Sequence, residues 1–293
     1  MINSKYYKIF NLLRDTIVNF NKERAYQYGA ALSYYMLFSI VPMLVVVIQF
    51  FGLVFGQETV EASLLSYFSD SFGSGNQDYL SSTIHRLTDL SEFSWIEKTI
   101  GICVLIFTST GVFYSIETSV SKLWHLKEGK KKKKKAIVKP LLSRIKSFSM
   151  LLITGLIILL TFFLESISAS ALDVIFEYND SIERSLVFLT HLVLGVLLSS
   201  ISFILIFKFL VPAKINWKVT LIGAIVTAII FELGSLLIGY YLNSSNITAV
   251  YGFMGSIMII LAWVFYSSQI IFLGAKFTYE LGKYLQMPIK SKL

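Results

Sequence analysis

The stretch WKVTLIGAIVTAIIFELGSLLIGYYL, residues 217–242, contains only two charged side chains, Lys218 and Glu232. About 20 consecutive apolar residues are enough for an α-helix to cross the hydrocarbon core of a bilayer. Five more apolar stretches are also longer than this limit, at roughly 29–55, 99–121, 148–171, 186–211 and 250–275. The sequence therefore predicts an all-α polytopic membrane protein with six transmembrane helices.

The composition of the whole chain agrees with this prediction. The 293 residues are 55% hydrophobic and 15% charged, whereas soluble domains are about 25% charged. The net charge of +8 would suggest nucleic acid for a soluble protein. In a membrane protein the distribution of charge is more informative than its sum. The single cysteine, Cys103, excludes an internal disulfide and a cysteine-based metal cluster.

Basic and acidic residues alternate from one connection to the next. Basic residues outnumber acidic ones five to two in 1–28, eleven to one in 122–147 and four to one in 276–293. Acidic residues dominate seven to two in 56–98 and four to one in 172–185. Cytoplasmic loops retain Lys and Arg, so both termini are expected in the cytoplasm.

Six consecutive lysines lie in the basic connection between the second and third spans. On the cytoplasmic side they would meet anionic lipid headgroups. Each lysine near such a surface contributes about 1 kcal/mol of attraction. No aromatic residues alternate with them to stack on bases, so nucleic acid is not expected as a partner. Membrane lipids are the expected partners. The expected headgroup surface consists of Lys130, Lys131, Lys132, Lys133, Lys134 and Lys135.

Three parts of the chain are distinguished outside and around the spans. Residues 1–28 contain a basic amphipathic helix that we expect in the inner membrane interface. Residues 29–282 form a single six-helix transmembrane domain, with a helical hairpin in 56–98 on its outer face. Residues 283–293 form a cytoplasmic tail. The apolar side of the first helix is formed by Tyr6, Ile9, Phe10, Leu13, Ile17 and Phe20.

Glu232 is the ionisable residue placed deepest in a predicted span, and such residues are costly in lipid and often functional. It shares one helical face with the small residues Ala224, Ala228, Ser235 and Gly239. Small residues let another helix approach closely, so Glu232 is expected to face protein or a wet cavity. Two interpretations remain open: a buried carboxyl that holds the bundle together, and a site for a polar substrate or a proton.

Pro42 lies in the middle of the first span and is expected to kink it. Ser39, one turn earlier, offers a hydroxyl to the carbonyls that the proline frees. The kink either serves packing or shapes a groove for a lipid, in which case Tyr34 and Tyr35 would take part.

Two further polar residues complete the candidate substrate or proton path. His191 lies in the outer turns of the fourth span. Gln269, in the sixth span, is expected to form an interhelical hydrogen bond rather than to bind a ligand.

Catalytic patterns are absent from the sequence. The three histidines, His85, His125 and His191, fall in the outer loop, an inner loop and a span, so they cannot share one metal. No HExxH, GxxxxGK[ST] or GxSxG pattern occurs. We therefore expect no enzyme activity, no metal and no other cofactor.

Several stretches resemble the YihY/virulence factor BrkB family of membrane proteins over about residues 25–282. They are AALSYYMLFSIVPMLVVV (30–47), VPAKINWKVTLIGAIVTAIIFELGSLLIGYYL (211–242) and VYGFMGSIMIILAWVFYSSQIIFLGAKFTYEL (250–281). The most specific positions are Leu123, Trp124, Val211, Pro212, Trp217, Tyr251, Gly252, Leu273, Gly274 and Ala275. Lys276 stands where the family often has a carboxylate, so it is a poor candidate for shared chemistry.

The resemblance implies a six-helix bacterial inner-membrane protein. Some members are linked to the movement of envelope lipids, and some carry the label ribonuclease BN. A nuclease of that kind would need a histidine cluster that this sequence lacks. The leading hypothesis is therefore the movement of a lipid or another amphipathic envelope molecule. The alternatives are a non-transporting scaffold for envelope proteins and, last, a ribonuclease. The sequence leaves open whether the chain forms a homo-oligomer.

Overall fold

The structure, a computed structural model, describes residues 2–72, 107–108, 110–126, 145–157, 159–160, 164, 180–244 and 253–292. Helices dominate the described residues, as the sequence predicts. In chain order the elements are α1 (Ile2–Lys22), α2 (Ala25–Phe55), α3 (Gln57–Phe72), α6 (Gly111–Leu123), a short helix Ile145–Ile157, α8 (Asp180–Leu205), the π-helical turn η2 (Ile206–Leu210), β1 (Ala213–Lys214), α9 (Trp217–Ser244), α11 (Phe253–Tyr284) and β2 (Lys290–Ser291).

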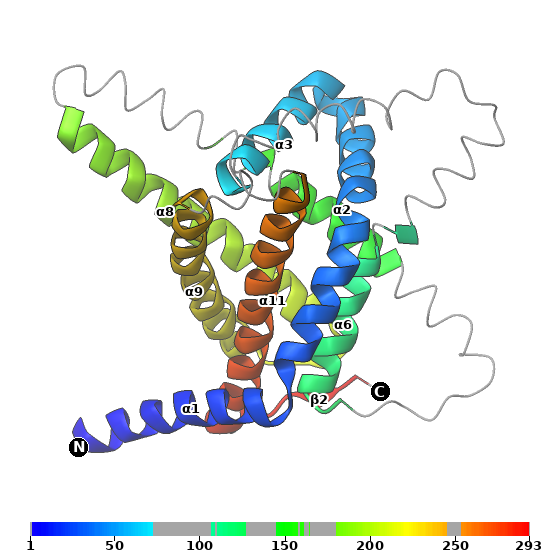
Figure 1. The fold of residues 1–293 in the computed structure, drawn as a ribbon. Coiled ribbons are helices and arrows are strands. Elements are labelled where there is room, and N and C mark those ends of the chain that lie inside the picture. Colours follow the sequence, from blue (N-terminus) through cyan, green and yellow to red (C-terminus); the bar gives the residue numbers. More distant parts are fainter. Residues whose placement is uncertain are drawn as a thin grey trace, which may run out of the picture.

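Helix α11 is the central element of the bundle. It packs along α2 on one side and along α9 on the other, and α8 packs along α9 (Figure 1). α3 caps the upper end in this view, and α1 lies across the lower end, crosswise to α2 and α11 (Figure 1). We call the lower end, which carries α1, the connection between α8 and α9, and β2, the basal end.

Three helical stretches in the described residues are long and apolar enough to cross a membrane: Leu192–Leu210, Trp217–Tyr241 and Met258–Tyr284. They overlap the last three spans predicted from the sequence, at 186–211, 217–242 and 250–275, but Met258–Tyr284 ends nine residues beyond the predicted end of the sixth span. A bent pair, Ala25–Ile40 and Pro42–Phe55, qualifies as a fourth span, with 52° between its halves. The kink expected at Pro42 is therefore present, since proline removes a helical hydrogen bond there.

The other predicted elements are covered only in part by the described residues. α6 overlaps the end of the second predicted span and Ile145–Ile157 overlaps the start of the third. α3 confirms a helix in the first half of the connection 56–98, while residues 73–98 lie outside the described residues, so the outer hairpin stays a prediction. The lysine run from Lys130 to Lys135 also lies outside them.

Helix α1 confirms the predicted N-terminal helix. It buries Leu12 and Thr16 in its contact with α11. Phe10, Leu13 and Ile17, which belong to the predicted apolar side, stay exposed. An exposed apolar side on a helix crosswise to the spans fits a helix that lies in a membrane interface.

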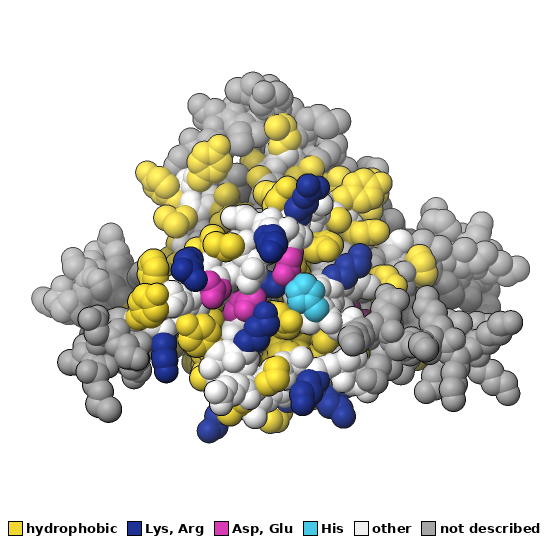
Figure 2. Space-filling view, turned by 90° about the horizontal axis from the view of Figure 1, so that it is seen from below, with side chains coloured by type: hydrophobic (Ala, Val, Ile, Leu, Met, Phe, Trp, Pro, Cys, Tyr) yellow, Lys and Arg dark blue, Asp and Glu magenta, His cyan; other side chains and the backbone are white. Residues whose placement is uncertain are grey.

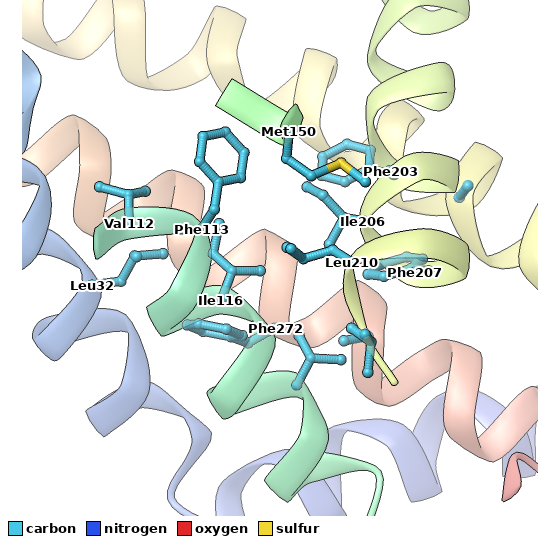
Figure 3. Packing of buried hydrophobic residues seen from close by; sticks show 14 of the residues in the cluster. Leu32, Val112, Phe113, Ile116, Met150, Phe203, Ile206, Phe207, Leu210 and Phe272 are labelled. Carbon is cyan, nitrogen blue, oxygen red and sulfur yellow. The ribbon is translucent and has the colours of Figure 1, made fainter. Parts of the chain in front are cut away.

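The hydrophobic core lies between α6, α11 and the basal half of α8 with η2. Phe113 and Ile116 of α6 face Phe203 and Ile206 from the α8 side, while Phe272 of α11 closes the cluster (Figure 3). In a bilayer such contacts gain little from the hydrophobic effect, because lipid tails are equally apolar. Close packing and polar contacts between helices must therefore hold the bundle together.

Helices α9 and α11 achieve this closeness with two glycine–threonine contacts. A Cβ added at Gly223 would lie 2.2 Å from Thr278 Oγ1, and one added at Gly274 would lie 2.1 Å from Thr227 Oγ1. Each threonine hydroxyl donates to a carbonyl of its own helix, Thr227 to Gly223 and Thr278 to Gly274. The glycines thus let the two backbones approach, and no hydroxyl is left unsatisfied.

Sharp chain reversals at the basal end are made by residues in the left-handed conformation. Arg24 (φ 52°) separates α1 from α2, His125 (φ 51°) follows α6, and Gln286 (φ 56°) follows α11. The backbone N–H of Leu126 donates to Ser121 O, and that of Met287 donates to Gly282 O, which closes both helix ends. These turns direct polar side chains of three helices toward one another.

Candidate functional site

Glu232 lies on α9 and faces α8, where it accepts a hydrogen bond from a serine. The hydroxyl of Ser199 donates to Glu232 Oε1 at 2.5 Å. The carboxyl is half-buried between the two helices. The expectation that Glu232 faces protein is therefore met by this contact.

Gly195, one helical turn before Ser199, makes room for the Glu232 carboxyl. A Cβ at this position would lie 3.0 Å from both Cδ and Oε2 of Glu232. Sequence reasoning found Glu232 but missed Gly195 and Ser199. The available signal was two small residues spaced four apart in a predicted span, which places both on one helical face where another helix can approach.

The small-residue face of α9 is packed over only part of its length. Ala224 and Ala228 are fully buried, and the Ser235 hydroxyl is buried with no hydrogen-bond partner among the described residues. At Gly239 an added Cβ would meet no described atom within 4 Å. Among the residues that the structure describes, close packing therefore extends past Glu232 to Ser235 and does not reach Gly239.

The structure does not bring the candidates on α2 together with Glu232. Tyr34 and Tyr35 are exposed, and α11 lies between α2 and α9 (Figure 1). Ser39 is buried and donates to Thr108 O at 2.9 Å, a carbonyl of another segment. The expectation that its hydroxyl compensates the carbonyls freed by Pro42 was wrong, because its single donor hydrogen is used by Thr108 O.

The remaining candidates lie apart from the Glu232 contact. Gln269 of α11 donates to Tyr26 O of α2 at 3.4 Å, which is the interhelical hydrogen bond expected from the sequence. His191 belongs to α8, and its side chain lies outside what the structure describes.

A cluster of charged side chains lies at the basal end, which we call the basal ion cluster. It comprises Glu23, His125, Lys276, Glu280 and Lys283. Lys276 is fully buried, and its ammonium lies 2.6 Å from Glu23 Oε1 and 3.7 Å from Glu280 Oε1. His125 Nε2 lies 3.1 Å from Glu23 Oε1, and Lys283 lies 3.2 Å from Glu280 Oε2. Figure 2 shows acidic, basic and histidine side chains gathered at the centre of this face.

The basal ion cluster joins residues that are far apart in the sequence. Glu23 lies in the turn between α1 and α2, His125 follows α6, and Lys276 belongs to α11. Asn19 of α1 adds a hydrogen bond to Glu280 Oε1 at 2.9 Å. One buried lysine therefore connects the N-terminal helix and the first span to the last helix.

Two of the sequence stretches singled out above meet beside this cluster. The indole N–H of Trp124 donates to Ala275 O at 2.7 Å, and Trp124 is almost completely buried. Its ring also packs against Phe207 of η2, with centroids 5.9 Å apart. Lys276 directly follows Ala275. It was considered a poor candidate from the sequence, yet it forms the centre of the basal ion cluster. The Lys276–Glu280 spacing of four residues was the only sequence signal for this role.

The comparisons with known proteins now decide the family. The family model described as virulence factor BrkB matches residues 16–291. This chain belongs to the virulence factor BrkB family. It is a membrane protein of that family, related to bacterial proteins named UPF0761 membrane protein, among them YihY.

The curated relatives of this BrkB-family chain are distant and often longer. A UPF0761 membrane protein of Teredinibacter turnerae is 24% identical over 93% of this chain and 62% of its own length. One from Aeromonas salmonicida is 23% identical over 94% and 89%. YihY of Salmonella typhimurium is 26% identical over 64% and 60%. The chain thus spans less than two thirds of the length of several relatives. No solved structure matches it.

Proposed function

We propose that this BrkB-family protein moves a lipid or another amphipathic envelope molecule across or within the bacterial inner membrane. The proposal includes six spans and cytoplasmic termini, as the alternating charge indicates. The observation that carries it is the Glu232–Ser199 contact between two apolar helices. A polar group of this kind is expensive inside a bilayer and is usually kept for substrates or protons.

The depth of Glu232 supports this proposal. It follows the first residue of the span Trp217–Tyr241 by 15 positions and precedes the last by 9. At 1.5 Å per residue these are roughly 22 Å and 14 Å along the helix. A lipid headgroup that crosses the membrane must pass through this depth, where water is not available to solvate it.

The surroundings of Glu232 favour an amphipathic substrate. Leu233 and Leu236 on α9 are exposed on the bundle surface, as are Val193 and Leu197 on α8. The carboxyl thus lies between α8 and α9, and both helices have aliphatic side chains on their exposed surfaces. Such a surface suits acyl chains, while Glu232 and Ser199 offer hydrogen-bond partners to a headgroup.

The test is lipid translocation in liposomes with purified protein and labelled phospholipid. We expect wild type to move the lipid, and Glu232→Gln and Ser199→Ala to lose most of the rate. Glu58→Gln is the matched control, because it makes the same chemical change at an exposed position in the first turn of α3. Equal rates for Glu232→Gln and wild type would remove the proposal's main support. Folded, inserted wild type that moves none of the lipids would favour the scaffold alternative.

A further inference from the structure

The chain after α11 folds back onto the connection between α8 and α9. β2 pairs with β1 in an antiparallel two-stranded sheet, with Ala213 opposite Ser291 and Lys214 opposite Lys290. The backbone N–H of Lys292 donates to Pro212 O at 3.2 Å and extends the contact. The predicted cytoplasmic tail is therefore attached to the basal end in its last residues.

The register places two like charges side by side. Residues directly opposite in an antiparallel pair project to the same face, with Cβ atoms about 5 Å apart, and like charges there are destabilising. Lys214 and Lys290 are both exposed. Neither takes part in an ion pair within the described part of the chain. The segments that carry them, VPAKINWKV (211–219) and QMPIKSK (286–292), contain no acidic residue.

Further positive charge surrounds this pair. Lys218 is exposed in the first turn of α9. Lys208 of η2 donates to Ile215 O, and the charge of Lys292 lies within electrostatic reach of it. The basal surface at β1 and β2 therefore attracts anions, and the register concentrates this attraction between Lys214 and Lys290.

An exposed aromatic pair at the same connection between α8 and α9 lies next to Lys208. The rings of Phe209 and Trp217 lie 6.2 Å apart, and the two residues are 48% and 52% exposed. The ammonium of Lys208 lies 4.7 Å from the Trp217 ring centroid. Tryptophan beside lysine is the usual combination at the headgroup level of a membrane.

The position in the fold decides between a lipid and another anion. The candidate span Leu192–Leu210 ends at this connection, and the span Trp217–Tyr241 begins there. The lysine pair therefore lies where a bilayer surface would meet the bundle. A soluble polyanion would have to bind Phe209 and Trp217 in the region that the headgroups occupy.

We propose that Lys214 and Lys290 bind the phosphate of an anionic phospholipid, with Trp217 and Phe209 against its glycerol and upper acyl region. The bound phosphate offsets the repulsion between the two ammonium groups. It thereby fastens the C-terminal segment to the connection between α8 and α9. This site is separate from Glu232 and does not depend on the transport proposal.

The first test measures binding to the full chain in neutral detergent micelles. The probe is a short-chain fluorescent phosphatidylglycerol, with phosphatidylcholine as the uncharged comparison. Lys214→Gln/Lys290→Gln should weaken phosphatidylglycerol binding roughly 30-fold, since each lysine near an anionic surface is worth about a factor of five. The matched control is Lys22→Gln/Lys122→Gln, which removes the same charge from exposed positions outside β1 and β2. Equal weakening in both double variants, or none in either, would overturn the proposal.

A second measurement keeps the test valid if binding and folding are linked. Without lipid, the Lys214→Gln/Lys290→Gln variant should unfold at the same or a higher temperature than wild type, because a repulsion is removed. Phosphatidylglycerol should raise the unfolding temperature of wild type and leave that of the variant unchanged. Displacement of the probe by an equal concentration of inorganic phosphate would show a free-anion site and refute the lipid assignment.

Discussion

Replacing the buried lysine of the basal ion cluster is the sharpest test of how the bundle is held together. We consider Lys276→Met, which keeps the length and apolar stem of the side chain and removes its charge. The ammonium lies 2.6 Å from Glu23 Oε1 and 3.7 Å from Glu280 Oε1. At an effective dielectric constant near 20, these distances correspond to gross attractions of ~6 and ~4 kcal/mol, before the cost of desolvation.

The net effect is smaller than the gross attraction, because burying the charges is itself unfavourable. Removing one partner of a buried pair costs about 3–5 kcal/mol, since the other charge stays buried and uncompensated. Glu280 keeps Lys283 and Asn19, and Glu23 keeps His125. We therefore expect the lower end, about 3 kcal/mol. On the scale of soluble domains of 150–250 residues this lowers the unfolding temperature by roughly 6–12 °C.

Lys283→Met is the matched control for this experiment. Lys283 lies on the same helix, pairs with the same Glu280 and also lies over the ring of Tyr279, but its side chain is 48% exposed compared with 1% for Lys276. Exposed ion pairs contribute about 0–1 kcal/mol, so this variant should unfold within ~4 °C of wild type. Both are measured by intrinsic fluorescence during heating in one detergent. If Lys276→Met lowers the unfolding temperature no more than Lys283→Met does, the reasoning is refuted.

Two further substitutions test the packing between helices, with thermal unfolding as the measurement. Gly223→Ala should destabilise the protein by about 1–3 kcal/mol, because its Cβ would lie 2.2 Å from Thr278 Oγ1. At Gly239 an added Cβ would meet no described atom within 4 Å, so Gly239→Ala should leave the stability unchanged or raise it slightly. A larger decrease in unfolding temperature for Gly239→Ala than for Gly223→Ala would contradict this account. Trp124→Phe removes the hydrogen bond to Ala275 O and should cost about 1–3 kcal/mol, whereas an unchanged unfolding temperature would show that this contact adds no stability.

Hydropathy alone predicted much of the helical architecture. The last three spans and the bent first one are found where the apolar stretches lie, and the kink follows from Pro42. These features are local: backbone hydrogen bonds must be satisfied within each span, and proline breaks one of them wherever it stands. The same logic singled out Glu232, because a carboxyl in an apolar stretch is visible without any neighbour.

The partners of these residues were not visible in the sequence. Ser199 and Gly195 are ordinary small residues in an apolar stretch, and only the packing of α8 on α9 brings them to Glu232. Tyr34 and Tyr35 are neighbours of Pro42 in sequence, yet the rotation of α2 directs them outward. Hydropathy marks an apolar segment but does not show which side of it other helices cover, so it could not tell exposed positions from buried ones.

The sequence by itself determined the class of protein, the apolar spans that the structure also describes and the place of Glu232 within one of them, since these depend on the composition of single segments. Only the tertiary structure decided which side chains meet. Glu23, His125, Lys276 and Glu280 come from three separate parts of the chain, and the register of β1 and β2 places Lys214 opposite Lys290. Such contacts depend on helix rotation, turn geometry and strand register, which are set by the packing of the whole chain and not by any one stretch.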